Sequence, residues 1–299
     1  MGAVSTRVGR LRQAVGRRTG TGLLLPLLLF DLLVFVVPFG YLLRISLSER
    51  GGTQAYAEGT WSVEGYSYLL DPSNTIAETF VFTLGFGVVV TVVSVAVATL
   101  YAHAMWRADG SLRVVLVAGA LVSMFTAIVV KLFAALLVYS PDGVLNGLLV
   151  SVGLLSEPLR LVNNGVGAVI GQLYIVVPYS ILAVYAVLST VDESLLEAAR
   201  DLGANGPRAF VEVVVPHAVP GILVAGVISF TWSIGSYAAP LLLGSGSERT
   251  NGVLVSDLLL REFDWAAAAA LAVVVTATVL GGLVVGRLVL SRREVSASG

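Results

Sequence analysis

Six long apolar segments constrain the fold of this chain more than any other feature. They occupy about residues 22–45, 76–105, 114–139, 165–188, 221–243 and 265–290. A helix needs roughly 20 apolar residues to cross the hydrocarbon core of a bilayer, and each segment is long enough. Hydrophobic residues make up 57% of the chain and charged residues 12%, which is more apolar surface than a soluble core can bury. The sequence therefore predicts an all-α integral membrane protein with six transmembrane helices.

The first apolar segment follows several arginines, as a signal peptide does, but it is too long for the apolar region of one. It leads into Arg44 and not into a small-residue cleavage site, so we expect it to be retained. We divide the chain into a basic arm at 1–21, a transmembrane domain at 22–290 and a short tail at 291–299.

The distribution of arginine predicts the orientation of the chain. Positively charged residues are concentrated in the cytoplasmic segments of membrane proteins. With the N-terminus inside, the cytoplasmic segments hold most of the arginines, and the outer segments hold only Arg44, Arg50, Arg160, Arg249 and Arg261. We therefore expect a multi-pass protein of the plasma or inner membrane with both termini in the cytoplasm. The polar segment at about 191–220 then faces the cytoplasm as well.

That polar segment has the pattern of a short surface helix, a bend and a re-entry point. Two alanines beside an acid let the backbone of another protein approach closely, and Gly203 can take the positive φ that ends a helix. Pro216 and Pro220 mark the return towards the membrane. The residues that we expect to dock on a partner are Glu197, Ala198, Ala199, Asp201, Leu202, Gly203, Arg208 and Pro216.

This segment resembles the EAA loop of permease subunits in binding-protein-dependent ABC importers. The family pattern is Glu-Ala-Ala, three residues, Gly, nine residues and then Ile-x-Leu-Pro. The acid, both alanines, the glycine and the proline are in register here, whereas Val213 and Val215 replace the isoleucine and leucine. The resemblance implies a type I, MetI-like permease fold in which this loop docks on an ATPase. The alternative is an amphipathic surface helix that contains Glu-Ala-Ala by chance.

The resemblance also implies a set of partners. No Gly-rich phosphate loop of the GxxxxGK[ST] kind is present, so the chain carries no cofactor and ATP would be bound by a separate subunit. By family resemblance the machine contains a dimer of ABC ATPases, a second permease subunit or a second copy of this one, and an extracytoplasmic substrate-binding protein. The remaining partner is the lipid bilayer.

Two further stretches resemble the polyamine (spermidine and putrescine) branch of the family. Residues 229–244 match a Ser-Phe…Ser-x-Gly…Pro-x-Leu-Leu-Gly pattern. Lys131 and Phe133 stand where that branch often has Arg-x-Tyr. The resemblance implies a permease for a polyamine-like solute, with phosphonate, ferric iron and thiamine as the alternatives within the branch.

Ionisable and hydroxyl side chains inside the spans are candidates for the translocation path. Lys131 either lines this path or extends along its stem to the outer interface. Three hydroxyls recur at four-residue spacing, so they share one face of a continuous helix and either line the path or bond between helices. Asp31 lies in the inner half of the first span. The candidate path residues are Lys131, Phe133, Ser229, Ser233, Tyr237 and Pro240.

Composition excludes several other functions. Cysteine is absent and only two histidines are present, so no metal site and no thiol chemistry are expected. A net charge of −1 gives no footprint for nucleic acid. An intramembrane enzyme would need a paired nucleophile and base, which His103 does not supply. An ion-coupled secondary transporter would show inverted repeats and more charges near the midplane.

Overall fold

The computed structural model describes residues 26–51, 55–246 and 248–297, and these residues contain helices and no strands. The predicted basic arm at 1–21 lies outside them. The helices, in chain order, are η1 (Leu32–Val36), α2 (Val37–Ser46), α3 (Glu64–Leu69), α4 (Ile76–Arg107), α5 (Gly110–Phe125), α6 (Ile128–Tyr139), α7 (Val144–Ser151), α8 (Gly165–Leu188), α9 (Ser194–Asp201), α10 (Gly206–Ala209), η2 (Phe210–Val214), α11 (Val215–Ile234), α12 (Ala238–Leu243), α13 (Asn251–Leu260) and α14 (Trp265–Ala297).

In the part of the chain that the structure describes, six helical stretches are long and apolar enough to cross a membrane, which confirms the predicted fold class. They are Pro26–Ser46, Ile76–Arg107, Ile128–Ser151, Gly165–Leu188, Gly206–Ile234 and Trp265–Val284. The second and fourth agree with the sequence prediction to within two residues. The last helix continues to Ala297, so most of the tail that we predicted at 291–299 is helical.

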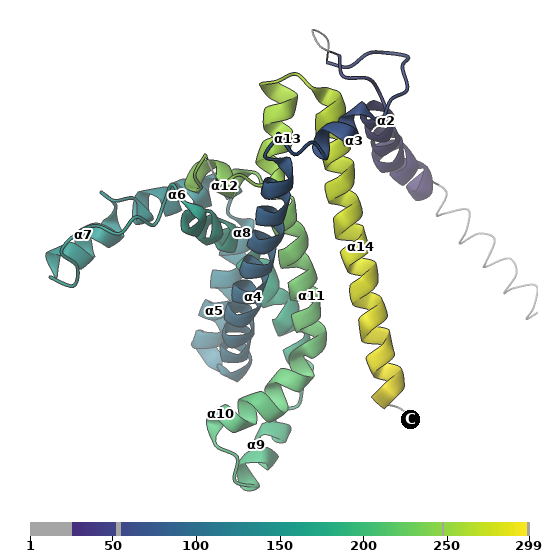
Figure 1. The fold of residues 1–299 in the computed structure, drawn as a ribbon. Coiled ribbons are helices and arrows are strands. Elements are labelled where there is room, and N and C mark those ends of the chain that lie inside the picture. The colour runs from purple at the N-terminus through teal and green to yellow at the C-terminus, as the bar shows by residue number, and fades with distance from the viewer. Residues whose placement is uncertain (1–25, 52–54, 247, 298–299) are drawn as a thin grey trace, which may run out of the picture.

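The prediction of one helix over 114–139 is wrong. The chain leaves helical geometry at Thr126 (φ −68°, ψ 132°) and Ala127 (φ −57°, ψ 136°), which separates α5 from α6. In Figure 1, α6 and α7 run off to the left, across the direction of α4, α8 and α11. The third apolar segment is therefore a bent element and not a single rod.

The prediction of one helix over 221–243 is also wrong at both ends. The helix begins at Gly206 as α10 and continues without a break through η2 and α11, so Pro216 lies inside it and does not mark its start. A proline removes one backbone N–H and clashes with the carbonyl four residues earlier, and the wider π-helical turn η2 just before Pro216 accommodates both effects. The helix then ends at Ile234, and a short break precedes α12.

The core of the fold is the three-helix packing of α4, α8 and α11, which contact one another more than any other helices do. Small residues bring these backbones close together: a Cβ built on Gly221 of α11 would lie 2.9 Å from the carbonyl oxygen of Ala183 in α8. Three buried serines, Ser94 of α4, Ser180 of α8 and Ser229 of α11, also form a hydrogen-bonded triangle, which we call the serine triangle. Helices in a membrane pack through small residues and such polar contacts, because lipid supplies no hydrophobic driving force.

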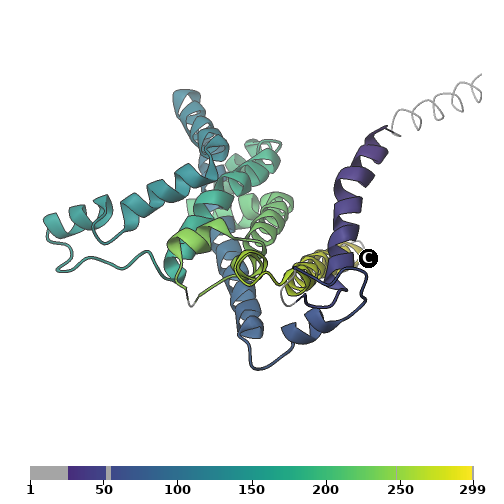
Figure 2. The ribbon, with the colours of Figure 1, turned by 90° about the horizontal axis from the view of Figure 1, so that it is seen from above.

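Helices α14, α2 and α3 form a second group beside this core. Figures 1 and 2 show α14 and α2 side by side, away from α6 and α7. Arg50 binds Asp264 at 2.5 Å and lies over the ring of Tyr68, which ties the loop after α2 to the start of α14. Gly65 of α3 packs directly on the backbone of Ala266. We call the end of the molecule with α3 and α13 the α13 end, and the opposite end the α9 end (Figure 1).

Candidate functional site

The predicted EAA-loop segment folds as the short helix α9, a tight turn and the start of the long helix α10–η2–α11. Asp192 precedes α9, and hydrogen bonds from Ser194 hold the pKa of its carboxyl group below the ordinary value. An ionised acid at this position favours the start of a helix. Figure 1 shows α9 and α10 at the same end of the molecule as the C-terminal end of α14.

Gly203 ends α9 in the left-handed conformation that its position in the sequence predicted. Its φ is +87°, and its N–H donates to the carbonyl of Arg200 at 2.8 Å. The N–H of Ala204 donates to the carbonyl of Ala199 at 3.0 Å. These two hydrogen bonds are those of a Schellman motif, which satisfies the last carbonyls of a helix and depends on a residue with positive φ.

The next turn is also stabilised by a side chain. The side-chain oxygen of Asn205 accepts a hydrogen bond from the N–H of Arg208 at 3.0 Å, as a helix N-cap does. Arg208 in turn forms an ion pair with Glu212 at 2.9 Å, one helical turn further on. The connection between α9 and α10 is therefore short and fixed at both ends.

One side of α9 packs on the bundle. Leu196 is 3% exposed and belongs to a hydrophobic cluster with Met105, Trp106 and Leu188. Arg113 adds a polar contact, because its guanidinium donates to the carbonyls of Ala108 and Trp106 and lies 3.7 Å from the carboxylate of Glu193, just before α9. Sequence reasoning counted Arg113 only as a charge, and no local motif indicates that it holds α9.

The other side of the segment faces outwards. Glu197, Ala198, Asp201 and Arg208 are exposed, and Pro216 is exposed on the following helix; Ala199 is half-buried. Leu202 is 89% exposed, which leaves an apolar side chain available to another protein. The structure thus brings most of the predicted docking residues to one end of the molecule, on a small and well-supported element.

The structure does not bring the predicted path residues together. Ser229 and Ser233 are fully buried, and Ser229 belongs to the serine triangle of the core, at 2.8 Å from Ser180. The shared helical face that we predicted for three hydroxyls is wrong, because Tyr237 lies beyond the end of α11. Ser229 fits the alternative reading, which was hydrogen bonding between helices, whereas the hydroxyl of Ser233 donates to the carbonyl of Ser229 within α11.

The other candidate residues lie in different surroundings. Phe133 is 51% exposed and Pro240 is buried. Lys131 is only 6% exposed, and its ammonium group donates to the backbone carbonyl of Tyr174 in α8 at 3.3 Å. Asp31 is exposed at the residue before η1, where its side chain makes no capping hydrogen bond.

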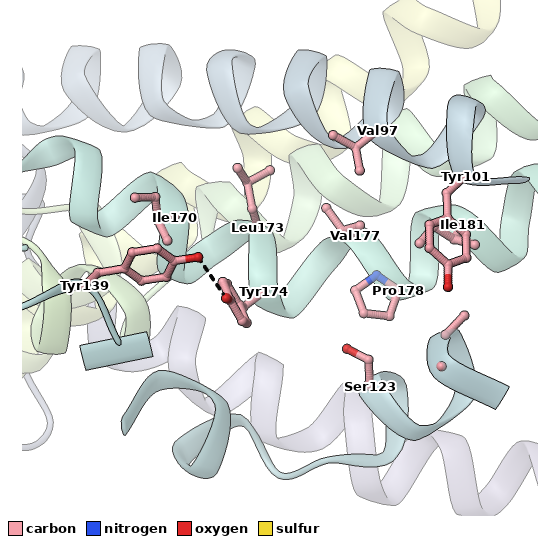
Figure 3. Close-up of a pocket in the computed structure, with 12 residues that line it drawn as sticks. Val97, Tyr101, Ser123, Tyr139, Ile170, Leu173, Tyr174, Val177, Pro178 and Ile181 are labelled. Atoms are coloured by element: carbon pink, nitrogen blue, oxygen red, sulfur yellow. Dashed lines mark hydrogen bonds between the residues drawn. The ribbon is translucent and has the colours of Figure 1, made fainter. Parts of the chain in front are cut away.

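A cavity of about 480 Å³ lies between α4, α5, α6 and α8, and no sequence motif pointed to it. It is mainly apolar, with the hydroxyl groups of Tyr101, Ser123, Tyr139 and Tyr174 in its lining (Figure 3). The two hydroxyls of Tyr139 and Tyr174 are 3.0 Å apart. None of the six predicted path residues lines this cavity. Among the described residues, no group of three or more His, Asp or Glu side chains could hold a metal ion.

Comparison with known proteins settles the family. Residues 148–293 match the family described as the binding-protein-dependent transport system inner membrane component. The chain is 31% identical over 258 residues to the inner membrane ABC transporter permease protein YdcU of Escherichia coli K12, covering 79% of this chain and 80% of that protein. The chain belongs to this ABC permease family. It is also 28% identical over 236 residues to the spermidine/putrescine transport system permease protein PotB of Haemophilus influenzae, covering 78% of this chain and 82% of that protein.

Solved structures agree with the fold of this permease. A bacterial ABC transporter that imports the acidic polysaccharide alginate contains a chain that superposes with a TM-score of 0.71 at 17% identity, over 93% of this chain and 98% of that one. A bacterial alginate ABC transporter in complex with an alginate pentasaccharide-bound periplasmic protein gives a TM-score of 0.73 at 17% identity, over 91% of this chain and 93% of that one. These structures show the same fold, and the family match makes the chain the permease subunit of an ABC importer. Permease subunits of this family are not enzymes, and the family assignment excludes the secondary-transporter and intramembrane-enzyme alternatives.

Proposed function

We propose that this permease forms the membrane path for a polyamine-like solute. The observation that supports this solute most is the similarity to PotB, a spermidine/putrescine permease, over about four-fifths of both chains. PotB of Escherichia coli K12 is similar as well, at 24% identity over 229 residues. The Ser-Phe…Pro-x-Leu-Leu-Gly pattern at 229–244 points to the same branch.

The energy for import comes from a separate ATPase dimer that docks on α9. The Schellman motif at Gly203 and the cap at Asn205 make this element compact, and its exposed face carries Glu197 and Ala198 of the Glu-Ala-Ala triplet. When ATP binding closes the two ATPase subunits, α9 moves with them. Because α10, η2 and α11 form one continuous helix, that movement passes directly into the membrane.

Two more partners complete the importer. One is a second permease subunit or a second copy of this chain, and the other is an extracytoplasmic substrate-binding protein that delivers the solute to the α13 end. A structural neighbour was crystallised with its periplasmic protein, which supports the second partner. ATP binds only to the ATPase, so this chain needs no cofactor.

A second solute class is favoured by one relative. The permease is 26% identical over 159 residues to the putative 2-aminoethylphosphonate permease PhnU of Salmonella typhi, covering 53% of this chain and 55% of that protein. This match is shorter than the match to PotB, so we rank a phosphonate second. Ferric iron and thiamine, the other solutes of the branch, are supported only by the sequence resemblance.

Uptake in cells distinguishes the two solute classes. In a strain without other polyamine importers, deletion of the gene for this permease is expected to lower the initial uptake rate of radiolabelled putrescine and spermidine at least tenfold. A plasmid copy of the gene is expected to restore that rate. Uptake of 2-aminoethylphosphonate in the same strain serves as the comparison. If polyamine uptake is unchanged and 2-aminoethylphosphonate uptake is lost, the solute is a phosphonate and not a polyamine.

The orientation in the membrane is a further prediction. We propose that the α9 end and both termini face the cytoplasm, because the arginine distribution favours this arrangement. The chain lacks cysteine, so single cysteines can be placed at two exposed positions, Ser73 near the α13 end and Asn205 near the α9 end. In intact cells an impermeant maleimide is expected to label only position 73, and position 205 reacts after permeabilisation. Labelling at 205 in intact cells would contradict both the orientation and the docking of an ATPase on α9.

A further inference from the structure

A proline in the interior of α8 leaves one backbone carbonyl without its usual partner. Pro178 lies inside this 24-residue helix and is buried. In an α-helix the N–H of residue 178 would donate to the carbonyl of residue 174, but proline has no N–H. The carbonyl of Tyr174 therefore lacks its helical hydrogen bond, and in a membrane no water is present to replace that bond.

Lys131 supplies a donor to this carbonyl from another helix. Its ammonium nitrogen lies 3.3 Å from the carbonyl oxygen of Tyr174, and only 6% of the residue is exposed. The contact is supported by close packing, since a Cβ on Gly171 would lie 3.1 Å from the side chain of Leu132. A glycine at this turn of α8 thus lets the Leu132 side chain of α6 pack close to the backbone of α8.

A second contact from α6 reaches the same residue. The hydroxyl of Tyr139 lies 3.0 Å from the hydroxyl of Tyr174, as Figure 3 shows, with Pro178 further along α8. Tyr174 is thus held twice by α6, once through its backbone and once through its side chain. The break at Thr126 and Ala127 lies just before α6, so α6 can take the direction that both contacts require.

We propose that Lys131 is a positioning residue that replaces the helical hydrogen bond removed by Pro178 and thereby fixes α6 to the proline turn of α8. This role differs from lining the path and from extension to the membrane interface. What matters for it is a hydrogen-bond donor at the carbonyl of Tyr174. The requirement for Lys131 then depends on the presence of Pro178. Neither a path-lining role nor extension to the interface predicts this dependence.

A double-mutant cycle in the assembled importer tests this dependence. The thermal midpoint of the solubilised complex is measured for wild type, Lys131→Met, Pro178→Ala and the double variant. Lys131→Met is expected to lower the midpoint by about 3 °C or more in the wild-type background. In the Pro178→Ala background the restored N–H binds the carbonyl, so the same change is expected to lower it by about 1 °C or less. Pro220→Ala in α11 is the control, because it changes a proline of another helix and is not expected to rescue Lys131→Met.

Initial uptake rates give a second readout of the cycle. Lys131→Met is expected to slow uptake at least fivefold, and the double variant is expected to stay within about twofold of Pro178→Ala. Equal losses in both backgrounds, or no loss at all in the wild-type background, would overturn the proposal. The thermal midpoints do not depend on the solute, so an incorrect solute class leaves this test intact.

A third variant covers the case in which Pro178→Ala does not assemble. Lys131→Arg keeps N–H donors at least as far along the side chain as the ammonium nitrogen of lysine. A midpoint within about 1 °C of wild type supports the proposal, whereas a loss as large as that of Lys131→Met contradicts it.

Discussion

Replacing Gly221 with alanine is expected to remove most of the assembled permease from the membrane. The new Cβ would lie 2.9 Å from the carbonyl oxygen of Ala183 and 2.9 Å from the Cα of Val184. Both atoms belong to the backbone of α8, so no side chain can turn away to make room. Overpacking of this kind costs about 1–3 kcal/mol, which corresponds to roughly a 5- to 150-fold fall in the ratio of folded to unfolded protein. Leucine at this position adds three more carbons and should leave no assembled protein.

Gly226 offers a matched control in the same helix. A Cβ there would meet only side-chain methyl groups, of Thr91 at 3.9 Å and Val95 at 4.0 Å, which is ordinary van der Waals contact. Gly226→Ala should therefore assemble as wild type does, or slightly better, because alanine favours a helix more than glycine. The measurement is the amount of monodisperse complex recovered from equal quantities of membrane. Equal recovery of the two variants would contradict the close packing of α8 and α11.

Gly203→Val is expected to stop transport while leaving the permease in the membrane. A β-branched residue in the left-handed conformation is strained by roughly 1–2 kcal/mol, so the Schellman motif that ends α9 would open. The position is exposed and a Cβ would meet nothing within 4 Å, so packing of the bundle is unaffected. We expect uptake to fall at least tenfold at normal abundance, because α9 would no longer present a fixed surface to the ATPase.

The same substitution at Gly206 separates the effect of backbone strain at Gly203 from the effect of a larger side chain. Gly206 is exposed in the same segment with open space around it, and its φ is outside the left-handed region. Gly206→Val should keep most of the uptake. Uptake by Gly203→Val within about twofold of wild type, with the protein at normal abundance, would remove the support for α9 as the coupling element.

Local signals in the sequence predicted part of this structure. Gly203 has positive φ, as expected for a glycine that follows a short polar helix. The helices at Ile76–Arg107 and Gly165–Leu188 were predicted to within two residues, because their apolar runs end at polar residues. Fold class and family also followed from the sequence. Each of these features depends on residues that are close together in the chain.

Features that depend on distant residues could not be predicted. The break after Phe125 contains neither glycine nor proline, so nothing in the local sequence marks it. The partner of Lys131 is a carbonyl made available by a proline 47 positions later, which no helical periodicity reveals. Arg113 holds the start of α9 through one long side chain. The break after Ile234 does contain Gly235, and Pro240 follows in the same apolar run, but the sequence did not show that the helix ends before them.

The position of Gly221 within its helix has a mechanical consequence. Gly206–Ile234 is one helix of 29 residues, roughly 44 Å long at 1.5 Å per residue. Gly221, which packs directly against the backbone of α8, is near its midpoint, with about 22 Å on one side and 20 Å on the other. A tilt of this helix would therefore pivot near the glycine. A tilt of about 10° there displaces the two ends by about 4 Å in opposite directions, so a push at the α9 end becomes an equal and opposite swing at the α13 end.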